Sequence, residues 1–329
     1  MENFELPYER CGNSGLFLPK ISLGLWHNFG GNDDFDEAEK ILLTAFENGV
    51  AHFDLANNYG PPPGSAEENF GKMLRRGLSA HRDEIVVSSK AGHRMWRGFY
   101  GDGCSRKSLV ASCDQSLRRT GLEYFDIFYA HRFDGVTPLE ETAGALSQLV
   151  RSGKALYAGI SKFPPAETAK ICAMLRGNGT PCLVYQGRYS LFERGPEREI
   201  LSLARELGVG FIAFSPLAQG LLTNKYLHGI PERSRAANPN GFLRREQVTP
   251  QKVAAARRLD EIARSRGQTL AQLALAWLLQ NRFVTSVLVG ASTRAQLLEN
   301  LSAVNSAPFS DAELAQISDA AALGNEPKN

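Results

Sequence analysis

The sequence predicts an α/β protein whose eight parallel strands close into a (β/α)8 barrel, or TIM barrel. Three observations support this fold class: short β-rich runs alternate with longer helical segments, the unit recurs eight times within 329 residues, and each crossover is long enough for a right-handed return. The alternative, an open doubly wound sheet, usually shows Gly-x-Gly-x-x-Gly after the first strand of a nucleotide-binding protein. The Gly-Asp-Gly run at 101–103 does not continue that pattern and lies in a long loop, so the barrel is favoured.

The repeating unit can be followed from residue 21 onward. The first unit pairs the β-rich run 21–26 with the amphipathic stretch 36–48. It recurs as 51–55 with 66–76, 85–89 with 105–119, 125–130 with 139–151, and 155–160 with 165–175. Three further strands cover 182–186, 209–214 and 285–289, and each is followed sooner or later by a helical segment. We expect the residues before 21 to form a short antiparallel plug.

Two irregular segments, 92–105 and 215–250, are longer than the connections usual in such a fold. Both follow strands, so both are expected on the face formed by the carboxyl ends of the strands. No linker or low-complexity tract divides the chain. We therefore expect residues 1–329 to form a single domain.

Composition limits the function classes. With 43% hydrophobic residues the chain can bury a large core, which excludes a disordered protein. The net charge of +2 comes from interspersed charges without a basic stripe, so no nucleic-acid partner is expected. The five cysteines are scattered and form no C-x-x-C pair, and the six histidines are dispersed, which argues against a disulfide framework and a metal site. Without a signal sequence or an apolar run of about 18 residues, we expect no membrane partner and a cytoplasmic location.

Polar residues stand where successive strands end. Asp54 follows the second strand with Tyr59 five positions on, Lys90 follows the third, and His131 follows the fourth. The reacting residues of such barrels come from strand carboxyl ends and the loops after them. Each of these residues alone has an ordinary structural interpretation, as a cap or as packing. Their joint placement on three successive strand ends favours a shared site.

These four residues together suit proton transfer to a carbonyl oxygen. Free tyrosine has a pKa of about 10 and is a weak acid at neutral pH. A neighbouring ammonium favours the phenolate, so Lys90 is expected to lower the pKa of Tyr59, with Asp54 holding the lysine in place. Tyr59 would then be the general acid. His131 would orient the carbonyl oxygen by a hydrogen bond or help relay the proton.

The motifs around these residues resemble the three catalytic signatures of aldo-keto reductases. The runs are FDLANNYG at 53–60, SSKAG at 88–92 and DIFYAH at 126–131. The resemblance extends from about Tyr8 to Ala307. It implies a (β/α)8 barrel that reduces aldehydes or ketones with NADPH and has no Rossmann fold. By position, Asp54, Tyr59, Lys90 and His131 match the family's catalytic tetrad.

Two further runs, GPPPGSAEE at 60–68 and AFSPLAQGLLTNKY at 213–226, are similar to the bacterial L-glyceraldehyde 3-phosphate reductase branch. The resemblance implies an NADPH-dependent reductase of small aldehydes, with L-glyceraldehyde 3-phosphate, methylglyoxal and simple aldehydes as candidates. Potassium channel β subunits also look similar. The alternative is therefore an NADPH-binding regulatory or redox-sensing subunit with slow turnover. The resemblance also implies a homo-oligomer.

The resemblance further implies where NADPH lies. Ser161 and Gln186 would hold the nicotinamide carboxamide, although Lys162 stands where many relatives have asparagine. Residues 215–217 would begin a segment over the pyrophosphate that brings Lys225 and Arg235 to it; the alternative is a solvated basic strip. Ser292, Arg294 and Gln296 would face the 2′-phosphate, and Glu299 and Asn300 the adenine. The full expected set is Trp26, Ser161, Gln186, Phe214, Ser215, Pro216, Leu217, Lys225, Arg235, Gly290, Ser292, Arg294, Gln296, Glu299 and Asn300.

The loop after the third strand mixes aromatic residues with cations. Trp96, Arg97 and Tyr100 are expected to form a wall for a small polar aldehyde. Arg97, Arg106 or Lys107 would meet a substrate phosphate. The alternative is that the aromatic residues only hold the loop in place.

Overall fold

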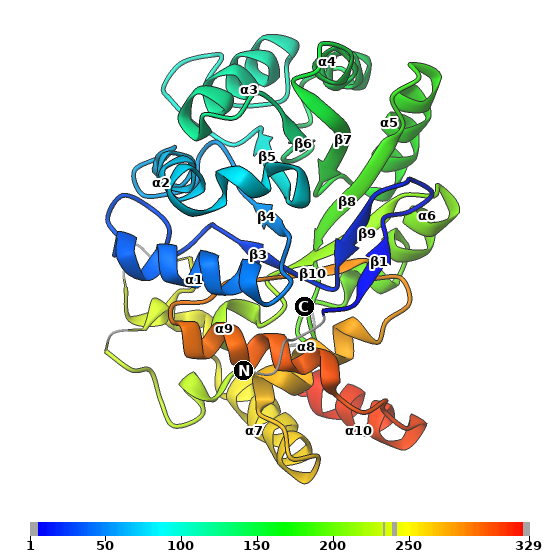
Figure 1. Cartoon of the computed structure of the whole chain (residues 1–329). Coiled ribbons are helices and arrows are strands. Elements are labelled where there is room, and N and C mark those ends of the chain that lie inside the picture. The colour runs from blue at the N-terminus through cyan, green and yellow to red at the C-terminus, as the bar shows by residue number, and fades with distance from the viewer. Residues whose placement is uncertain (1–5, 233, 239–241, 325–329) are drawn as a thin grey trace.

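Eight parallel strands close into a barrel in the order β10-β3-β4-β5-β6-β7-β8-β9 (Figure 1). The computed structural model describes residues 6–232, 234–238 and 242–324. The strands are β3 (Ile21–Gly24), β4 (His52–Asp54), β5 (Val86–Ala91), β6 (Phe125–Ala130), β7 (Ala155–Ser161), β8 (Cys182–Arg188), β9 (Gly210–Phe214) and β10 (Ser286–Val289). Val287 of β10 pairs with Ile21 on one side and Ala213 on the other, which closes the circle. The predicted barrel is confirmed, and the open sheet is wrong.

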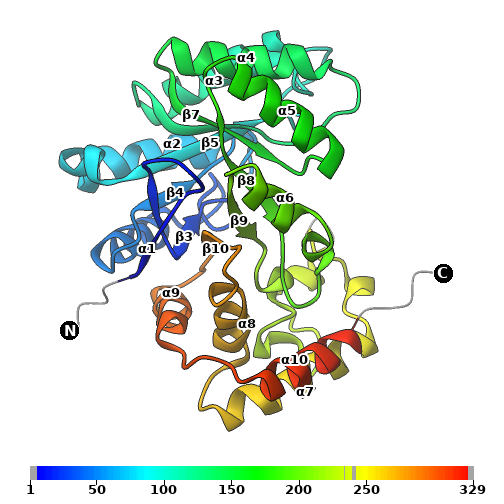
Figure 2. The same cartoon turned by 90° about the vertical axis from the view of Figure 1, so that its right-hand side faces the viewer.

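Helices surround the barrel (Figure 2), and most follow a strand as the repeat predicts, whereas α8 follows α7 and α10 follows α9. They are α1 (Phe35–Glu47), α2 (Ser65–Met73), α3 (Arg106–Thr120), α4 (Leu139–Arg151), α5 (Pro165–Gly177), α6 (Ile200–Glu206), α7 (Pro250–Ser265), α8 (Leu270–Leu279), α9 (Arg294–Leu301) and α10 (Asp311–Ala322). Side-chain caps mark several starts: Asp34 accepts from the Glu37 amide, and Ser105 accepts from the Ser108 amide. The helix expected to end at residue 76 ends at Met73, and a wider π-type turn continues it through Leu74–Leu78. No helix within the described ranges is long and apolar enough to cross a membrane.

The chain before the barrel forms the predicted antiparallel plug. Strands β1 (Tyr8–Arg10) and β2 (Phe17–Pro19) pair with each other. Leu18 and Cys11 are fully buried in a cluster with residues of β6, β8, β9 and β10. Gly12 has a φ of +55°, and a Cβ there would lie 2.2 Å from the Gly208 carbonyl oxygen, so only glycine fits where the hairpin meets the barrel. The hairpin therefore closes the barrel at the end where the strands begin, and leaves the end where the strands terminate uncovered by it.

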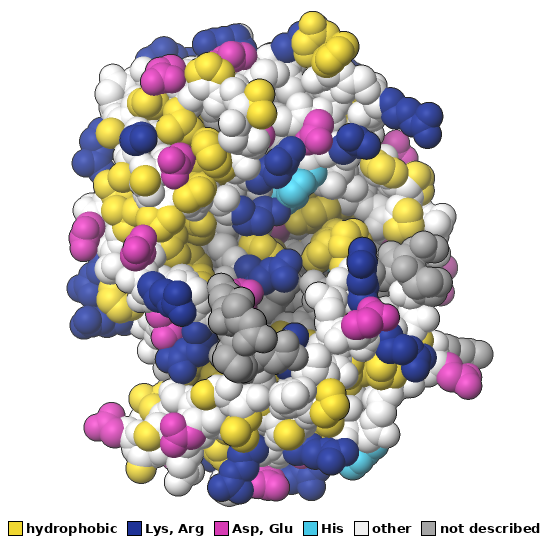
Figure 3. Space-filling view, turned by 180° about the vertical axis from the view of Figure 1, so that it is seen from behind, with side chains coloured by type: hydrophobic (Ala, Val, Ile, Leu, Met, Phe, Trp, Pro, Cys, Tyr) yellow, Lys and Arg dark blue, Asp and Glu magenta, His cyan; other side chains and the backbone are white. Residues whose placement is uncertain are grey.

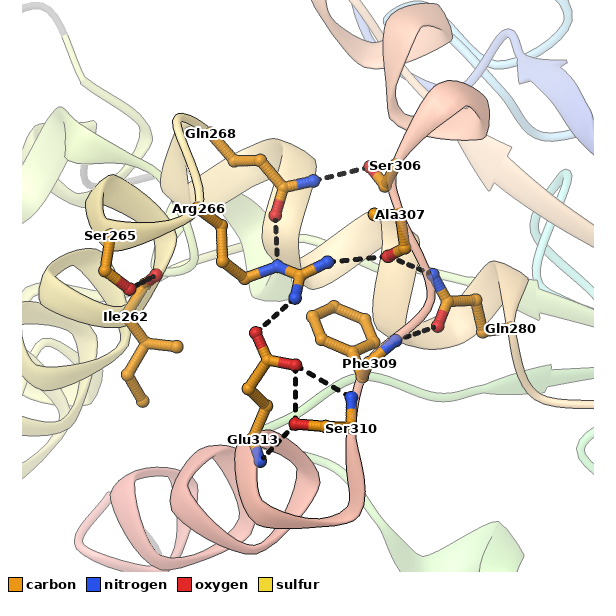
Figure 4. Close-up of polar contacts among 10 residues, drawn as sticks. All are labelled: Ile262, Ser265, Arg266, Gln268, Gln280, Ser306, Ala307, Phe309, Ser310 and Glu313. Carbon is orange, nitrogen blue, oxygen red and sulfur yellow. Dashed lines mark hydrogen bonds and ion pairs between the residues drawn. The ribbon is translucent and has the colours of Figure 1, made fainter.

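The last helices are held together by a polar network around Arg266, which follows α7 (Figure 4). Its guanidinium donates to Gln268 at 3.0 Å and to the Ala307 carbonyl at 2.6 Å, and it pairs with Glu313 in the first turn of α10. Glu313 also accepts from the amide of Ser310, the residue that caps α10, at 2.7 Å. The network therefore fixes α10 to the end of α7.

Candidate active site

A cleft of about 830 Å³ opens where the barrel strands end. Viewed from behind, this side of the molecule is hollowed near its centre, and Lys and Arg side chains gather around the hollow (Figure 3). Its volume is in the range of sites that take small molecules and cofactors. Seventeen of the expected site residues line it: Trp26, Asp54, Tyr59, His131, Ser161, Gln186, Phe214, Ser215, Pro216, Leu217, Lys225, Arg235, Gly290, Ser292, Gln296, Glu299 and Asn300. The structure therefore brings most of the predicted residues together.

A buried ion pair lies below the floor of the cleft. The Lys90 ammonium donates to Asp54 Oδ2 at 2.5 Å and to the Leu55 carbonyl at 2.6 Å, and both charged side chains are fully buried. The other carboxylate oxygen of Asp54 accepts from Ser88 at 2.7 Å and from Gln186 at 3.0 Å. These bonds satisfy the carboxylate on both sides. The pairing needs the ends of β4 and β5 side by side, which the barrel register provides.

Tyr59 and His131 lie over this pair. The Lys90 nitrogen is 5.2 Å from the centre of the Tyr59 ring, and the Tyr59 and His131 rings are 6.1 Å apart, edge to face. The Nδ1 atom of His131 is buried without a hydrogen-bond partner. Burial lowers the pKa of His131 well below its ordinary value, and nearby Lys162 and Lys90 lower it further. His131 is therefore a neutral imidazole near neutral pH.

The expectation that Lys90 lowers the pKa of Tyr59 is wrong for this structure. Burial raises the pKa of Tyr59 well above its ordinary value, and the nearby Asp54 carboxylate raises it further. The physical reason is that Asp54 neutralises the Lys90 ammonium at 2.5 Å, so little net positive charge reaches the phenol. Burial also lowers the pKa of Lys90, and Asp54 opposes that shift. The phenol therefore keeps its proton at neutral pH.

Ser161 and Gln186 lie side by side at the ends of β7 and β8, where their register pairs them. The Ser161 hydroxyl is buried and has no hydrogen-bond partner. The Gln186 side-chain amide donates to Asp54 Oδ1 at 3.0 Å, and that bond does not use its carbonyl oxygen. A buried hydroxyl without a partner is costly unless a ligand completes it. This pair therefore suits an amide-bearing ligand.

The other end of the cleft carries the cations and small polar groups expected for phosphates. Lys225 and Arg235 both line it, and burial lowers the pKa of each. Arg235 donates to Gln219 at 3.1 Å. Ser292 bonds Gln296 at 2.7 Å, across the start of α9. Arg294 is exposed and is not among the lining residues.

The loop after β5 does not bring its aromatic residues to the cleft. Trp96, Arg97 and Tyr100 are absent from the lining, and Phe99 is 98% exposed. The loop folds back on itself because the Met95 amide donates to the Gly101 carbonyl at 2.7 Å. Lys107 lies 5.2 Å from the Tyr100 ring, and Arg106 donates to Gln148 at 3.2 Å. His93 and Arg94, at the start of the loop, reach the cleft instead.

The cleft is also lined by residues that the predicted sets of catalytic, cofactor and substrate residues do not contain. They are Gly24, His27, Asn28, Asn58, His93, Arg94, Lys162, Arg188, Gln219, Gly220, Thr223, Asn224, Phe242, Thr269, Ala271, Leu288 and Val289. Phe242, from the long loop after β9, is 4.6 Å from Trp26 between ring centres and forms an aromatic wall with it. In the sequence, Phe242 is recognisable just as an aromatic residue within a polar segment, which does not indicate a site. Arg188 stands two residues after Gln186 on the same strand, and that spacing was a usable signal.

Unusual backbone geometry also gathers at the cleft. Across the described ranges, five non-glycine residues have positive φ: Asn28, Lys162, Ser215, Ala218 and Gln219. All of them except Ala218 line the cleft. Such conformations cost about 1–3 kcal/mol each and cluster at functional sites. That four of these five residues line the cleft supports a ligand site there, independently of the side-chain contacts.

Comparisons with known proteins agree with this geometry. A model of the aldo/keto reductase family matches residues 20–322. The chain is 54% identical over 317 residues to L-glyceraldehyde 3-phosphate reductase of Escherichia coli O157:H7, which covers 95% of this chain and 92% of that protein. It is 53% identical over 317 residues to the protein of the same name from E. coli strain K12, with the same coverage.

Proposed function

Since the chain belongs to the aldo/keto reductase family and is an oxidoreductase, we propose that it reduces small aldehydes with NADPH. L-Glyceraldehyde 3-phosphate, methylglyoxal and simple aldehydes are the candidate substrates. The name of the two E. coli relatives, L-glyceraldehyde 3-phosphate reductase, supports the first of these. The observation that carries the proposal is the buried Asp54–Lys90 pair directly beneath Tyr59 in the cleft.

The residues present fit NADPH. Ser161 offers a buried hydroxyl without a partner, which suits the nicotinamide carboxamide together with Gln186. Lys225 and Arg235 offer positive charge for the phosphates, and Ser292 and Gln296 stand at the amino end of α9. When bound, the nicotinamide would supply the hydride. The chain's own residues would position the aldehyde and deliver the proton.

Tyr59 is proposed to protonate the carbonyl oxygen. Its raised pKa keeps the phenol protonated until negative charge develops on that oxygen. Lys90, whose ammonium lies 5.2 Å from the centre of the Tyr59 ring, would stabilise the negative charge on the phenol oxygen only in part, because Asp54 offsets much of its positive charge. His131, neutral and near Tyr59, would donate a hydrogen bond that orients the carbonyl. The burial of Asp54, Lys90 and His131 limits water beside the reacting atoms.

The cytoplasmic location and a homo-oligomer also belong to the proposal. Five scattered cysteines suit a reducing compartment. Cell fractionation tests the location, and light scattering of the purified protein tests the assembly.

The direct test is to follow NADPH oxidation by the purified protein with glyceraldehyde 3-phosphate, methylglyoxal and an aromatic aldehyde, each repeated with NADH. Fast oxidation of NADPH by at least one aldehyde is the expected result. Tight NADPH binding without turnover on any of the three would overturn the enzyme assignment. That outcome would favour the regulatory or redox-sensing subunit.

A further inference from the structure

We propose that Lys162 and Arg188 form a binding site for a phosphate group on the substrate, at the opposite end of the substrate from its aldehyde. The inference rests on the proposed function, because it assumes that the aldehyde carbonyl meets Tyr59 and His131. Such a site would favour short aldehyde phosphates over other small aldehydes as substrates. The site is distinct from Lys225 and Arg235, which we assign to the cofactor.

The two cations lie against one aromatic ring. The Lys162 ammonium is 5.8 Å from the centre of the Phe214 ring, and the Arg188 guanidinium is 5.7 Å from it. Both residues line the cleft, Lys162 directly after β7 and Arg188 at the end of β8. Because β7 and β8 are neighbouring strands, their ends present both charges to the same part of the cleft.

This pair lies close to the reacting end. The Lys162 ammonium donates to His93 Nε2 at 2.8 Å, and the His93 ring packs edge to face on His131 with centres 4.5 Å apart. A carbonyl carbon and the phosphorus of a three-carbon aldehyde phosphate lie on the order of 5 Å apart, from bond lengths of about 1.5 Å. A substrate of this size would therefore reach from His131 to Lys162. A much longer aldehyde would carry its phosphate past the pair.

The charges of the pair are not balanced within the protein. Within the described ranges, neither Lys162 nor Arg188 forms an ion pair with a carboxylate. The nearby carboxylates are occupied, since Asp54 holds Lys90 and Asp102 holds Arg132 at 2.8 Å. Removal from water and the charges of Lys90 and Arg188 lower the pKa of Lys162 to about 8. A dianion between the two cations would relieve this repulsion.

The backbone at Lys162 supports a functional role. Its φ of +58° lies in the left-handed region, which is unfavourable for a lysine. A glycine would adopt this conformation at lower cost. The Lys162 side chain thus stands on a backbone that favours glycine, and it lines the cleft. The cations expected earlier for this purpose, Arg97, Arg106 and Lys107, do not line the cleft.

The test compares two substrates that differ only in the phosphate. For wild type and Arg188→Gln, kcat/KM is measured with glyceraldehyde 3-phosphate and with glyceraldehyde. The ratio of the two values is expected to fall about tenfold or more in Arg188→Gln, because a charge-assisted contact is lost only with the phosphorylated substrate. Arg188→Lys should restore part of the ratio. Lys162→Gln should lower the ratio too, but its bond to His93 also affects the reacting end, so Arg188 is the cleaner position.

Two controls separate the possible sources of the effect. Arg118→Ala removes the same charge from the exposed face of α3, outside the cleft, and should leave the ratio unchanged. Lys225→Ala should weaken NADPH binding without lowering the ratio. An Arg188→Gln variant that loses NADPH affinity and keeps the ratio would overturn the inference, because the cation would then serve the cofactor phosphates. Equal loss with both substrates would overturn it as well.

A binding measurement keeps the inference testable if the proposed reaction fails. Glycerol 3-phosphate and glycerol are titrated into the NADP⁺-loaded protein by calorimetry. Binding of glycerol 3-phosphate that Arg188→Gln weakens about tenfold or more would support the phosphate site even without turnover. Equal binding to wild type and variant would refute the site, even if aldehydes are reduced.

Discussion

Replacing Asp54 by asparagine should destabilise the protein, because it leaves the Lys90 ammonium buried without a counter-charge. Both side chains are fully buried, and within the described part of the chain the other hydrogen-bond acceptor of Lys90 is the Leu55 carbonyl. The asparagine oxygen can still accept from Ser88 and Gln186. The NH2 group of the asparagine then faces the Lys90 ammonium. Both groups are hydrogen-bond donors, whereas in the wild type the ammonium meets a carboxylate oxygen. Breaking a buried pair in this way costs about 3–5 kcal/mol, a large part of the total stability of a domain.

The loss should depend on pH in a defined direction. Burial lowers the pKa of Lys90 in the folded protein, and Asp54 opposes this shift, so the folded pKa falls further in Asp54→Asn. Between the folded and unfolded pKa values, the unfolded chain binds more protons, so stability rises with pH. The slope is at most about 1.4 kcal/mol per pH unit. The variant should therefore recover stability as pH rises toward about 10, where lysine becomes neutral in the unfolded chain.

Urea unfolding of wild type, Asp54→Asn, Lys90→Met and the double variant measures these effects. The double variant should be more stable than the sum of the single losses predicts, by about 2 kcal/mol or more, since it removes the unpaired charge. A loss under about 1 kcal/mol in Asp54→Asn would refute the reasoning, as would strictly additive losses.

Two further predictions concern the cofactor end and the last helix. Ser161→Ala should weaken NADPH binding about fivefold, since one neutral hydrogen bond contributes about 1 kcal/mol; fluorescence titration measures this, and Ser306→Ala outside the cleft is the matched control. Hydrogen bonds from Ser310 and Arg266 lower the pKa of Glu313 from 4.5 to about 2, so its contribution to stability is present above 4.5 and is lost as pH falls toward 2. Glu313→Gln should therefore be less stable than wild type at neutral pH and approach it in acid. Parallel urea curves with an equal gap at every pH would contradict this account.

The sequence was sufficient to predict the barrel and the gathering of Asp54, Tyr59, Lys90 and His131. A strand followed by a helix repeats with clear periodicity, and parallel strands necessarily end on one face. The predicted strand 125–130 and helix 139–151 have the bounds found in the structure. The single-domain organisation stays a prediction.

What could not be predicted depends on loop geometry and burial. Trp96 and Tyr100 follow a strand, but local hydrogen bonds turn their loop away from the cleft. The pKa of Tyr59 depends on how completely Asp54 neutralises Lys90, which spacing along the chain does not give. The placement of Lys162 and Arg188 near each other likewise depends on the register of β7 and β8. Such features arise from contacts between distant segments.

The central claim is that Tyr59 protonates the carbonyl oxygen during hydride transfer. Rapid mixing of NADPH-loaded protein with glyceraldehyde 3-phosphate, wild type against Tyr59→Phe, tests it in a single turnover. NADPH oxidation should be about a hundredfold slower or more in the variant, while NADPH still binds, because only the proton donor is removed. Oxidation at the wild-type rate in Tyr59→Phe would contradict the account.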